Sequence, residues 1–263
     1  MKPGITQICL PRRNLYADLD FARDTGYEAI ELVFSDEGEP SIDASADELA
    51  QVKSACDSRG LEIVSIRPLR QDGGSLLSPD AAERDKLVNI LSRGLEIAES
   101  LGVDGLLLHP GSLEPGVSYI KTWNNFRDAL KTLAPEAESR GCSIGVENVW
   151  NKFILSPLEA CRFVDEVGSS AVGIYIDVAN MILYGYPEMW IHDLGSRITK
   201  VHVKDFRRRD HAWVQLMDGD VDWPAVMREL RNIGFDGALV SEVGGDAAMA
   251  RETAERIAKI RNM

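Results

Sequence analysis

The feature that most constrains the fold is the alternation of short apolar runs with longer amphipathic stretches along nearly the whole chain. Parallel strands are covered on both faces, so they read as short, nearly continuous apolar runs, and a crossover joins each to the next. Eight runs fit this description. They predict strands over Ile5–Leu10, Ala29–Phe34, Glu62–Ile66, Gly105–His109, Ser143–Glu147, Gly173–Asp177, Lys200–Lys204 and Ala238–Glu242.

The amphipathic stretches between these runs predict helices. Ser45 and Glu48 have the spacing of a capping box, and Gly102 and Gly168 follow stretches where a left-handed C-cap needs no Cβ. Strands alternating with helices in this number favour a closed (β/α)₈ TIM barrel, with an open doubly wound sheet as the alternative. The helices are expected over Ala46–Arg59, Ala81–Leu101, Trp123–Arg140, Leu158–Val167, Ala225–Ile233 and Ala247–Ile260.

Length and charge narrow the class of protein further. The chain has 263 residues, so we expect residues 1–263 to form a single TIM barrel domain. Its net charge of -13 argues against nucleic acid or an anionic membrane as a partner. Because no apolar stretch approaches about 18 residues and no signal peptide is evident, we expect a cytoplasmic protein. The four cysteines form no C-x-x-C pair and are expected to be buried thiols; homo-oligomerisation is left open.

Ionisable residues stand at the ends of four consecutive expected strands. They are Glu147, Asp177, His202 and Glu242. The C-terminal ends of parallel strands point to one face of a barrel, so three carboxylates and one imidazole should converge there. This mixture of oxygen and nitrogen ligands suits one divalent ion, of which Mn²⁺, Co²⁺, Mg²⁺ and Zn²⁺ are the candidates. The pattern therefore predicts a metal-dependent enzyme.

Other strand ends supply further candidates. The second strand would deliver Glu31 or Phe34 to this face, and the fourth would deliver His109, which could contact a substrate. Lys204 follows His202 by two residues and either binds substrate, supports the metal ligands, or is the ion-pair partner of Asp205.

Phosphate recognition is a separate option on the same face. Arg67 ends the third strand, and with Ser65, Gly244 and Gly245 it could help to bind a phosphate group, since glycine exposes backbone N–H groups.

Four longer runs carry a family resemblance. They are Val146-Glu-Asn-Val-Trp-Asn, Tyr175-Ile-Asp-Val-Ala-Asn, Lys200-Val-His-Val-Lys-Asp-Phe and Gly219-Asp-Val-Asp-Trp. Together they resemble the sugar (phosphate) isomerase/epimerase family, the xylose-isomerase-like barrels that include ketose 3-epimerases and hexulose- and pentulose-phosphate epimerases. The resemblance covers essentially the whole chain and is densest from Cys142 to Glu242.

The resemblance implies roles for these residues. Glu147, Asp177, His202 and Glu242 would bind one divalent metal, most naturally Mn²⁺. The two glutamates would also act as the acid and base on opposite faces of a sugar or sugar phosphate. Removing a proton next to a ketone creates an enediolate, whose charge a metal stabilises.

The resemblance also implies residues that bind the substrate. Arg208 lies six residues after His202, where ketose epimerases place an arginine near the substrate oxygens. Asn180 lies three residues after Asp177, and its amide could bond a sugar hydroxyl. We therefore predict a metal-dependent isomerase of carbohydrate metabolism, with Arg67, His109, Asn180, Lys204 and Arg208 as substrate-binding residues.

Three other classes compete with this interpretation. A lyase that dehydrates keto-inositols or keto-sugars would use the same metal ligands and the same proton abstraction. A DNA-repair endonuclease shares the barrel, but its chemistry needs several metals, and the acidic balance opposes DNA binding. A non-catalytic sugar-binding barrel is the last alternative.

Overall fold

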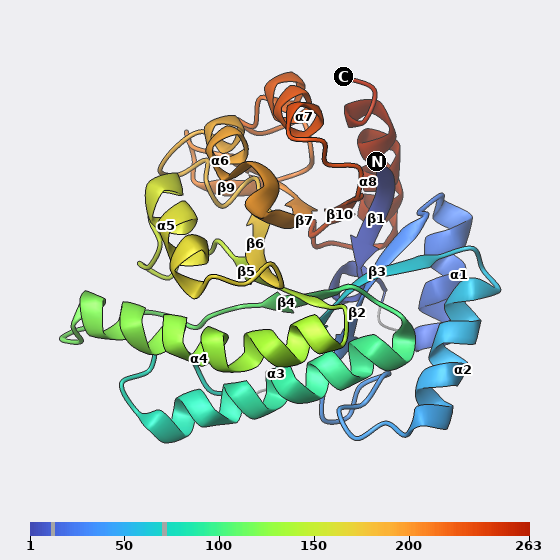
Figure 1. The fold of residues 1–263 in the computed structure, drawn as a ribbon. Helices are drawn as coiled ribbons and strands as arrows, with labels where there is room; N and C mark the ends of the chain where they lie inside the picture. Colours follow the sequence, from blue (N-terminus) through green and yellow to red (C-terminus); the bar gives the residue numbers. More distant parts are fainter. Residues whose placement is uncertain (12–13, 70–72) are drawn as a thin grey trace.

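The computed structural model describes residues 1–11, 14–69 and 73–263. Within these residues, eight parallel strands close into a barrel in the order β1, β2, β3, β4, β5, β6, β7 and β10, with β10 pairing with β1 (Figure 1). The fold is therefore the predicted TIM barrel. Its strands are β1 (Lys2–Thr6), β2 (Ala29–Phe34), β3 (Glu62–Pro68), β4 (Gly105–Leu108), β5 (Ser143–Glu147), β6 (Val172–Asp177), β7 (Ile198–Val203) and β10 (Ala238–Ser241).

Helices surround the barrel, and α8 packs against β1, so the two ends of the chain lie near each other (Figure 1). The helix predictions agree with the structure to within a few residues, and the capping box of Ser45 and Glu48 is present. The helices are α1 (Leu15–Thr25), α2 (Ala46–Asp57), α3 (Ala81–Leu101), α4 (Tyr119–Ser139), α5 (Pro157–Val167), α6 (Pro187–Leu194), α7 (Trp223–Asn232) and α8 (Ala247–Ile260).

The prediction of the first strand over Ile5–Leu10 is wrong in its second half. The strand runs over Lys2–Thr6, and Gln7–Cys9 form a short 3₁₀ helix, η1. The reason is the side chain of Gln7, whose Oε1 accepts a hydrogen bond from the Val33 amide at 2.8 Å. This side chain takes the place of a further backbone pairing between the first two strands.

Three further features have no counterpart in the predicted ranges. Helices α1 and α6 are shorter than most of the others, at 11 and 8 residues. A hairpin of β8 (Asp205–Arg207) and β9 (Ala212–Val214) follows β7 at the C-terminal end of the barrel. A second short 3₁₀ helix, η2 (Gly195–Arg197), joins α6 to β7.

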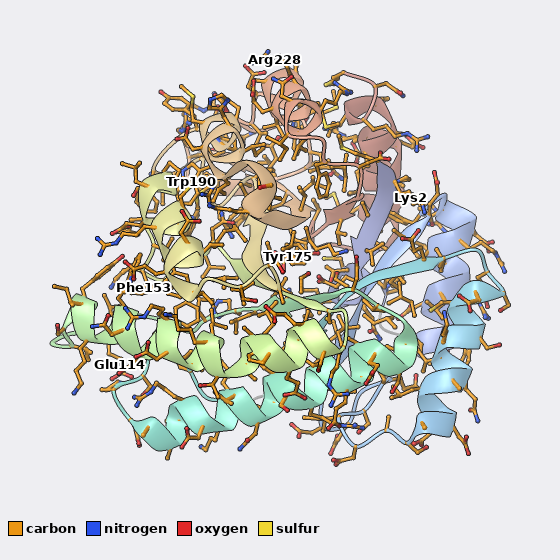
Figure 2. The ribbon with its side chains drawn as sticks, viewed as in Figure 1. Lys2, Glu114, Phe153, Tyr175, Trp190 and Arg228 are labelled. Carbon is orange, nitrogen blue, oxygen red and sulfur yellow. The ribbon has the colours of Figure 1, made fainter. Side chains whose placement is uncertain are left out.

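Alternate residues of β7 show how the interior is filled. Successive side chains of a strand point to opposite faces, so Lys200, His202 and Lys204 share one face. Lys200 pairs with Asp104 at the N-terminal end, at 2.6 Å, whereas His202 is fully buried further along. Tyr175 fills the middle of the barrel and is also fully buried (Figure 2).

Two expectations about the chain as a whole can be compared with the structure. Cys9, Cys56 and Cys142 are buried free thiols, as predicted, whereas Cys161 is half-buried. Across residues 1–11, 14–69 and 73–263, no helix is both long and apolar enough to cross a membrane.

Candidate metal centre

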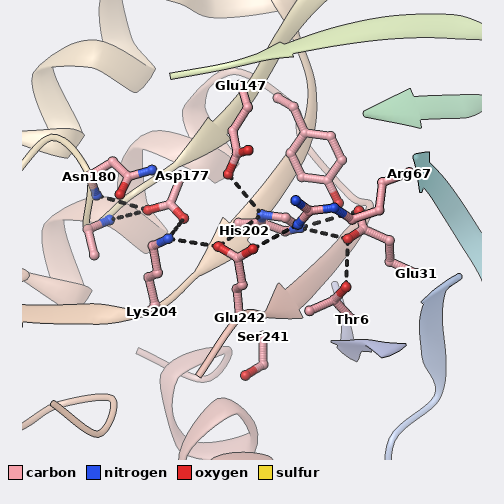
Figure 3. Close-up of polar contacts among 12 residues, drawn as sticks. Thr6, Glu31, Arg67, Glu147, Asp177, Asn180, His202, Lys204, Ser241 and Glu242 are labelled. Carbon is pink, nitrogen blue, oxygen red and sulfur yellow. Dashed lines mark hydrogen bonds and ion pairs between the residues drawn. The ribbon is translucent and has the colours of Figure 1, made fainter. Parts of the chain in front are cut away.

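The four ionisable residues predicted at the strand ends come together. Glu147, Asp177, His202 and Glu242 each offer one ligand atom, and these atoms all lie within 4.8 Å of one another (Figure 3). Parallel register explains this, because Asp177 of β6 pairs directly with His202 of β7. The first three residues are buried, whereas the side chain of Glu242 is 14% exposed. The centre is therefore open to solvent mainly on the Glu242 side.

Asp177 is held rigidly with one oxygen left over. Its Oδ1 accepts the amides of Ala179 and Asn180, both at 2.9 Å. The side chain of Asn148 bonds both backbone groups of Asp177. Oδ2 accepts no hydrogen bond, although the Lys204 amine lies 3.0 Å away. Burial raises the pKa of Asp177 to about 6, and Lys204 opposes this shift.

His202 is oriented from behind in the same way. Its Nε2 lies 3.2 and 3.3 Å from the two oxygens of Glu31. Its Nδ1 faces Glu147 at 3.4 Å and Glu242 at 3.9 Å, and it has no hydrogen-bond partner. Burial lowers the pKa of His202, but the surrounding carboxylates, with Glu31 foremost, outweigh burial and raise it to about 10.

These two atoms make no hydrogen bond, although each faces a charged neighbour, and they decide whether the residues fit a metal. A buried nitrogen and a buried oxygen without hydrogen bonds are costly in a folded protein unless something else binds them. His202 Nδ1 and Asp177 Oδ2 both belong to the four-residue cluster. The arrangement of imidazole, distal carboxylate and ligand site is typical of metal centres. The donor set therefore fits one divalent ion.

Glu31 was expected only as one of two residues that β2 could deliver to this face, with no role assigned, yet it supports the centre. It is fully buried, and its two oxygens accept hydrogen bonds from Thr6 and Ser65, both at 2.8 Å. Burial alone would raise its pKa, but His202 and Arg67 outweigh this effect and lower it to about 2. In the sequence, the one sign of this role is that Glu31 is an acidic residue within the otherwise apolar run of β2. The suggested phosphate contact of Ser65 is not supported, because its hydroxyl is buried against Glu31.

Two cations hold the fourth carboxylate. Arg67 donates to Glu242 Oε1 at 2.8 Å, and Lys204 donates to Oε2 at 2.7 Å (Figure 3). Burial would raise the pKa of Glu242, but His202, Lys204 and Arg67 hold it well below its usual range. The structure thus brings the predicted residues Arg67 and Lys204 into direct contact with the candidate metal ligands.

The other predicted substrate-binding residues lie further out. His109 is exposed and borders a cavity of about 520 Å³ that Arg67 also lines. Asn180 donates its side-chain amide to the backbone carbonyl of Asn148 at 2.8 Å. The guanidinium of Arg208 bonds the carbonyl oxygens of Ile182 and Gly185.

The ion pair suggested between Lys204 and Asp205 is wrong. Asp205 accepts four N–H groups, from Phe206, Met217, Val221 and the Trp223 indole. A Cβ at Gly219 would lie 2.1 Å from its Oδ1, so this position has no room for a side chain. The run Gly219-Asp-Val-Asp-Trp is therefore explained by the loop that wraps around Asp205, which leaves Lys204 free to face the metal centre.

The comparison with protein families assigns the fold group. The chain belongs to the xylose isomerase-like TIM barrel family, whose model matches residues 19–262. The predicted resemblance is thereby confirmed.

Two relatives that match the chain in sequence are named as epimerases. A 2-epi-5-epi-valiolone 7-phosphate 2-epimerase of Actinoplanes is 26% identical over 66% of this chain and 61% of its own length. The L-ribulose-5-phosphate 3-epimerase of Escherichia coli O157:H7 is 22% identical over 98% of this chain and 92% of its own length.

Solved structures share the fold at low identity. A D-tagatose 3-epimerase-like protein has a TM-score of 0.85 and 22% identity, and the match covers 100% of this chain and 97% of that one. The IolI protein with a bound zinc atom has a TM-score of 0.84 and 20% identity, with 100% and 98% covered.

Proposed function

We propose that the chain is a divalent-metal-dependent sugar or sugar-phosphate epimerase or isomerase, similar to ketose 3-epimerases. The observation that carries this proposal is the placement of two glutamates around one buried imidazole nitrogen. Glu147 and Glu242 lie 3.4 and 3.9 Å from His202 Nδ1 and approach it from different sides in Figure 3. The names of the relatives, which are epimerases of sugar phosphates, support the same class of enzyme.

Glu147, Asp177, His202 and Glu242 would hold the ion, with Mn²⁺ as our first choice and Co²⁺, Mg²⁺ or Zn²⁺ as alternatives. When bound, the ion would supply positive charge that lowers the energy of a substrate oxyanion. The zinc atom bound in the IolI structure is consistent with a metal at such a centre.

The proposed chemistry is a proton transfer between two faces of one carbon. One of the glutamates takes the proton next to the ketone, and the other returns a proton to the opposite face, which inverts the carbon. Arg67 and Lys204 keep Glu242 ionised and fix the direction of its oxygens. We leave open which glutamate serves which face.

Substrate binding is proposed for the predicted residues around this pair. Arg67 and Lys204 border the carboxylate of Glu242, and His109 lies on the rim of the neighbouring cavity. Asn180 and Arg208 bond backbone carbonyl oxygens with some of their N–H groups, and the remaining N–H groups could contact substrate.

The experiment that tests this function is proton exchange in D₂O. The protein is loaded in turn with each of the four metals and incubated with ketoses, ketose phosphates and keto-inositols. We expect metal-dependent deuterium uptake at C3 for an epimerase, or at C1 or C2 for an aldose–ketose isomerase. Glu147→Gln and Glu242→Gln should each lower the rate by about 10²–10⁴-fold.

Glu28→Gln is the matched control, since this exposed carboxylate bonds only the side chain of Arg261 among the contacts described. Wild-type turnover in both active-site variants would refute the proposal. Loss of water, seen as a new enone or diketone absorbance, would instead assign the chain to the keto-sugar dehydratases.

A further inference from the structure

A second cavity, of about 530 Å³, borders the metal centre on the Glu242 side, between β9, the segment after β10 and the segment after β1. We call it the apolar cavity. Lys204 and Glu242 form its edge toward the metal centre. Most of its remaining lining is apolar and comes from Ile8, Cys9, Trp213, Val214, Val243 and Met249.

We propose that the apolar cavity binds a ring-sized apolar or aromatic substituent of the substrate. The chain would then act on a keto-sugar that carries an aglycone, that is, on a glycoside. This inference rests on the proposed function and specifies its substrate class. The cavity falls within the range of about 300–1,000 Å³ that small-molecule sites occupy, so it has room for such a ring.

The chemistry of the wall disfavours a hydroxyl-rich group. Two polar side chains on the wall are already fully bonded. The carboxylate of Asp205 accepts four N–H groups of its own loop. Gln215 donates to Met249 and accepts from Thr253 and from the Leu216 amide. Sugar hydroxyls placed beside Val243 and Met249 would lose water without gaining partners, which is costly.

Trp213 provides a planar surface in this cavity. Its side chain is 49% exposed and lies on the β8–β9 hairpin. Trp150 stacks against it with ring centroids 4.9 Å apart, and the Lys204 amine lies 4.8 Å from its ring. The indole is therefore fixed before a ligand binds, and an apolar group that contacts its exposed part gains affinity at little entropic cost.

Met249 also lines the cavity and is fixed by hydrogen bonds from Gln215. The Gln215 amide donates to its sulfur at 2.9 Å and to its carbonyl oxygen at 3.3 Å. The apolar surfaces on both sides are thus held by bonds within the protein.

The cavity of about 520 Å³ that Arg67 lines is more polar. Arg67, Ser75, Ser78 and His109 line it beside the apolar Leu69, Leu87 and Ile90, and Arg67 bonds Glu242 directly. A substrate that lies across Glu242 would place its hydroxyls on this polar side and its aglycone on the side of Trp213.

Binding of two probes to the full-length, Mn²⁺-loaded protein tests this inference. Isothermal titration calorimetry would compare phenyl β-D-glucopyranoside with methyl β-D-glucopyranoside, which differ only in the aglycone. We expect the phenyl glycoside to bind about tenfold more tightly. Trp213→Ala should reduce this preference to under about threefold.

Two further variants complete the test. Met249→Ala should also weaken the preference, and it removes a different wall in case Trp213→Ala disturbs the hairpin. Tyr184→Ala removes a tyrosine that is 69% exposed and lies outside the cavity, so it should keep the full preference. Equal binding of the two probes, binding of neither, or a preference that survives in both cavity variants would overturn the inference.

Deuterium exchange on the same samples separates this inference from the proposed function. If small ketoses exchange deuterium but the phenyl glycoside binds no more tightly than the methyl glycoside, the aglycone site is refuted and the epimerase proposal is retained. A phenyl preference that depends on Trp213, without exchange on any substrate, would establish the site and remove the epimerase proposal.

Discussion

The two halves of the barrel contribute differently to the candidate metal centre. β5, β6, β7 and β10 carry Glu147, Asp177, His202 and Glu242, which could hold the ion. β1, β2 and β3 carry Thr6, Glu31, Ser65 and Arg67, which bond those residues or their partners.

This difference shows how a closed barrel divides the work of building a site. A strand end can place one donor atom, but it cannot fix the orientation of an imidazole or the rotation of a carboxylate. Groups on the facing strands do this for two ligands, as Glu31 does for His202 and Arg67 does for Glu242, whereas the amides just after β6 fix Asp177. Substitutions in the two halves should therefore give distinguishable defects.

The largest effect should come from the half that carries the ligands. Asp177→Ala removes the donor oxygen and leaves Lys204 without one of its two carboxylates. We expect loss of tight metal binding, with proton exchange lowered by about 10³-fold or more. Metal content after dialysis and deuterium uptake would measure this. A variant that keeps full metal content and exchange would break the distinction between the two halves.

A smaller effect is expected from the supporting half. Glu31→Gln keeps the shape of the side chain but removes the charge behind His202. Supporting residues of this kind typically change metal affinity by about 10–100-fold. Calorimetric titration with Mn²⁺ would measure it, with Glu28→Gln as the control. A variant with wild-type affinity would show that Glu31 serves folding alone.

Metal binding should also depend on pH through His202. Without metal, the neighbouring carboxylates raise the pKa of His202 to about 10. Because a ligating nitrogen must be neutral, metal binding should release a proton. Apparent affinity should then rise by about tenfold per pH unit between about pH 6.5 and 8. Titrations in buffers with different heats of ionisation would count the proton, and a flat affinity profile would contradict the prediction.

The raised pKa of His202 also determines how the stability of the metal-free protein changes with pH. Because the folded pKa lies above the ordinary value of 6.5, the stabilisation is complete below about pH 6.5. It is lost as the pH rises through about 10. Added metal should therefore raise the melting temperature more at pH 8 than at pH 6.5.

The smallest effect is expected at Tyr175, a residue of β6 that contacts the supporting residues from the ligand half. The hydroxyl of Tyr175 lies 3.2 Å from Ser65, which in turn bonds Glu31. Tyr175→Phe should lower the free energy of unfolding by about 1 kcal/mol and change exchange by less than about threefold. Urea denaturation would measure this. Tyr27→Phe, which removes a buried hydroxyl bonded to Ala250, is the matched control. If Tyr175→Phe lowered metal affinity and Tyr27→Phe did not, Tyr175 would belong with the residues that support the metal centre.

The ligand half was predictable because its residues follow a local rule. Each lies at or next to the end of an apolar run, and parallel strands deliver their ends to one face. The register of β6 and β7 then places Asp177 beside His202 with no further information. The same rule predicted that Arg67 and Lys204 would lie on this face.

The supporting half could not be predicted in this way. Thr6 ends β1, whereas Glu31 lies in the middle of β2, and nothing in the neighbouring sequence shows that it faces His202, which is 171 residues away. A slip of one residue in a strand sends its side chains to the other face, so such a contact exists only once the barrel closes. Arg67 was expected to contact substrate, yet its bond to Glu242 is a property of the closed barrel.

The sequence by itself therefore determined the strand–helix alternation and the four ligand positions, because these depend on periodicity and on residues next to one another along the chain. The tertiary structure alone decided which ligand atoms face the cluster without a hydrogen bond. Asp177 Oδ2 and His202 Nδ1 lack hydrogen bonds only because Ala179, Asn180 and Glu31 occupy the other sides of those groups. The apolar cavity likewise forms from segments after β1, β7 and β10, which meet only in the folded barrel.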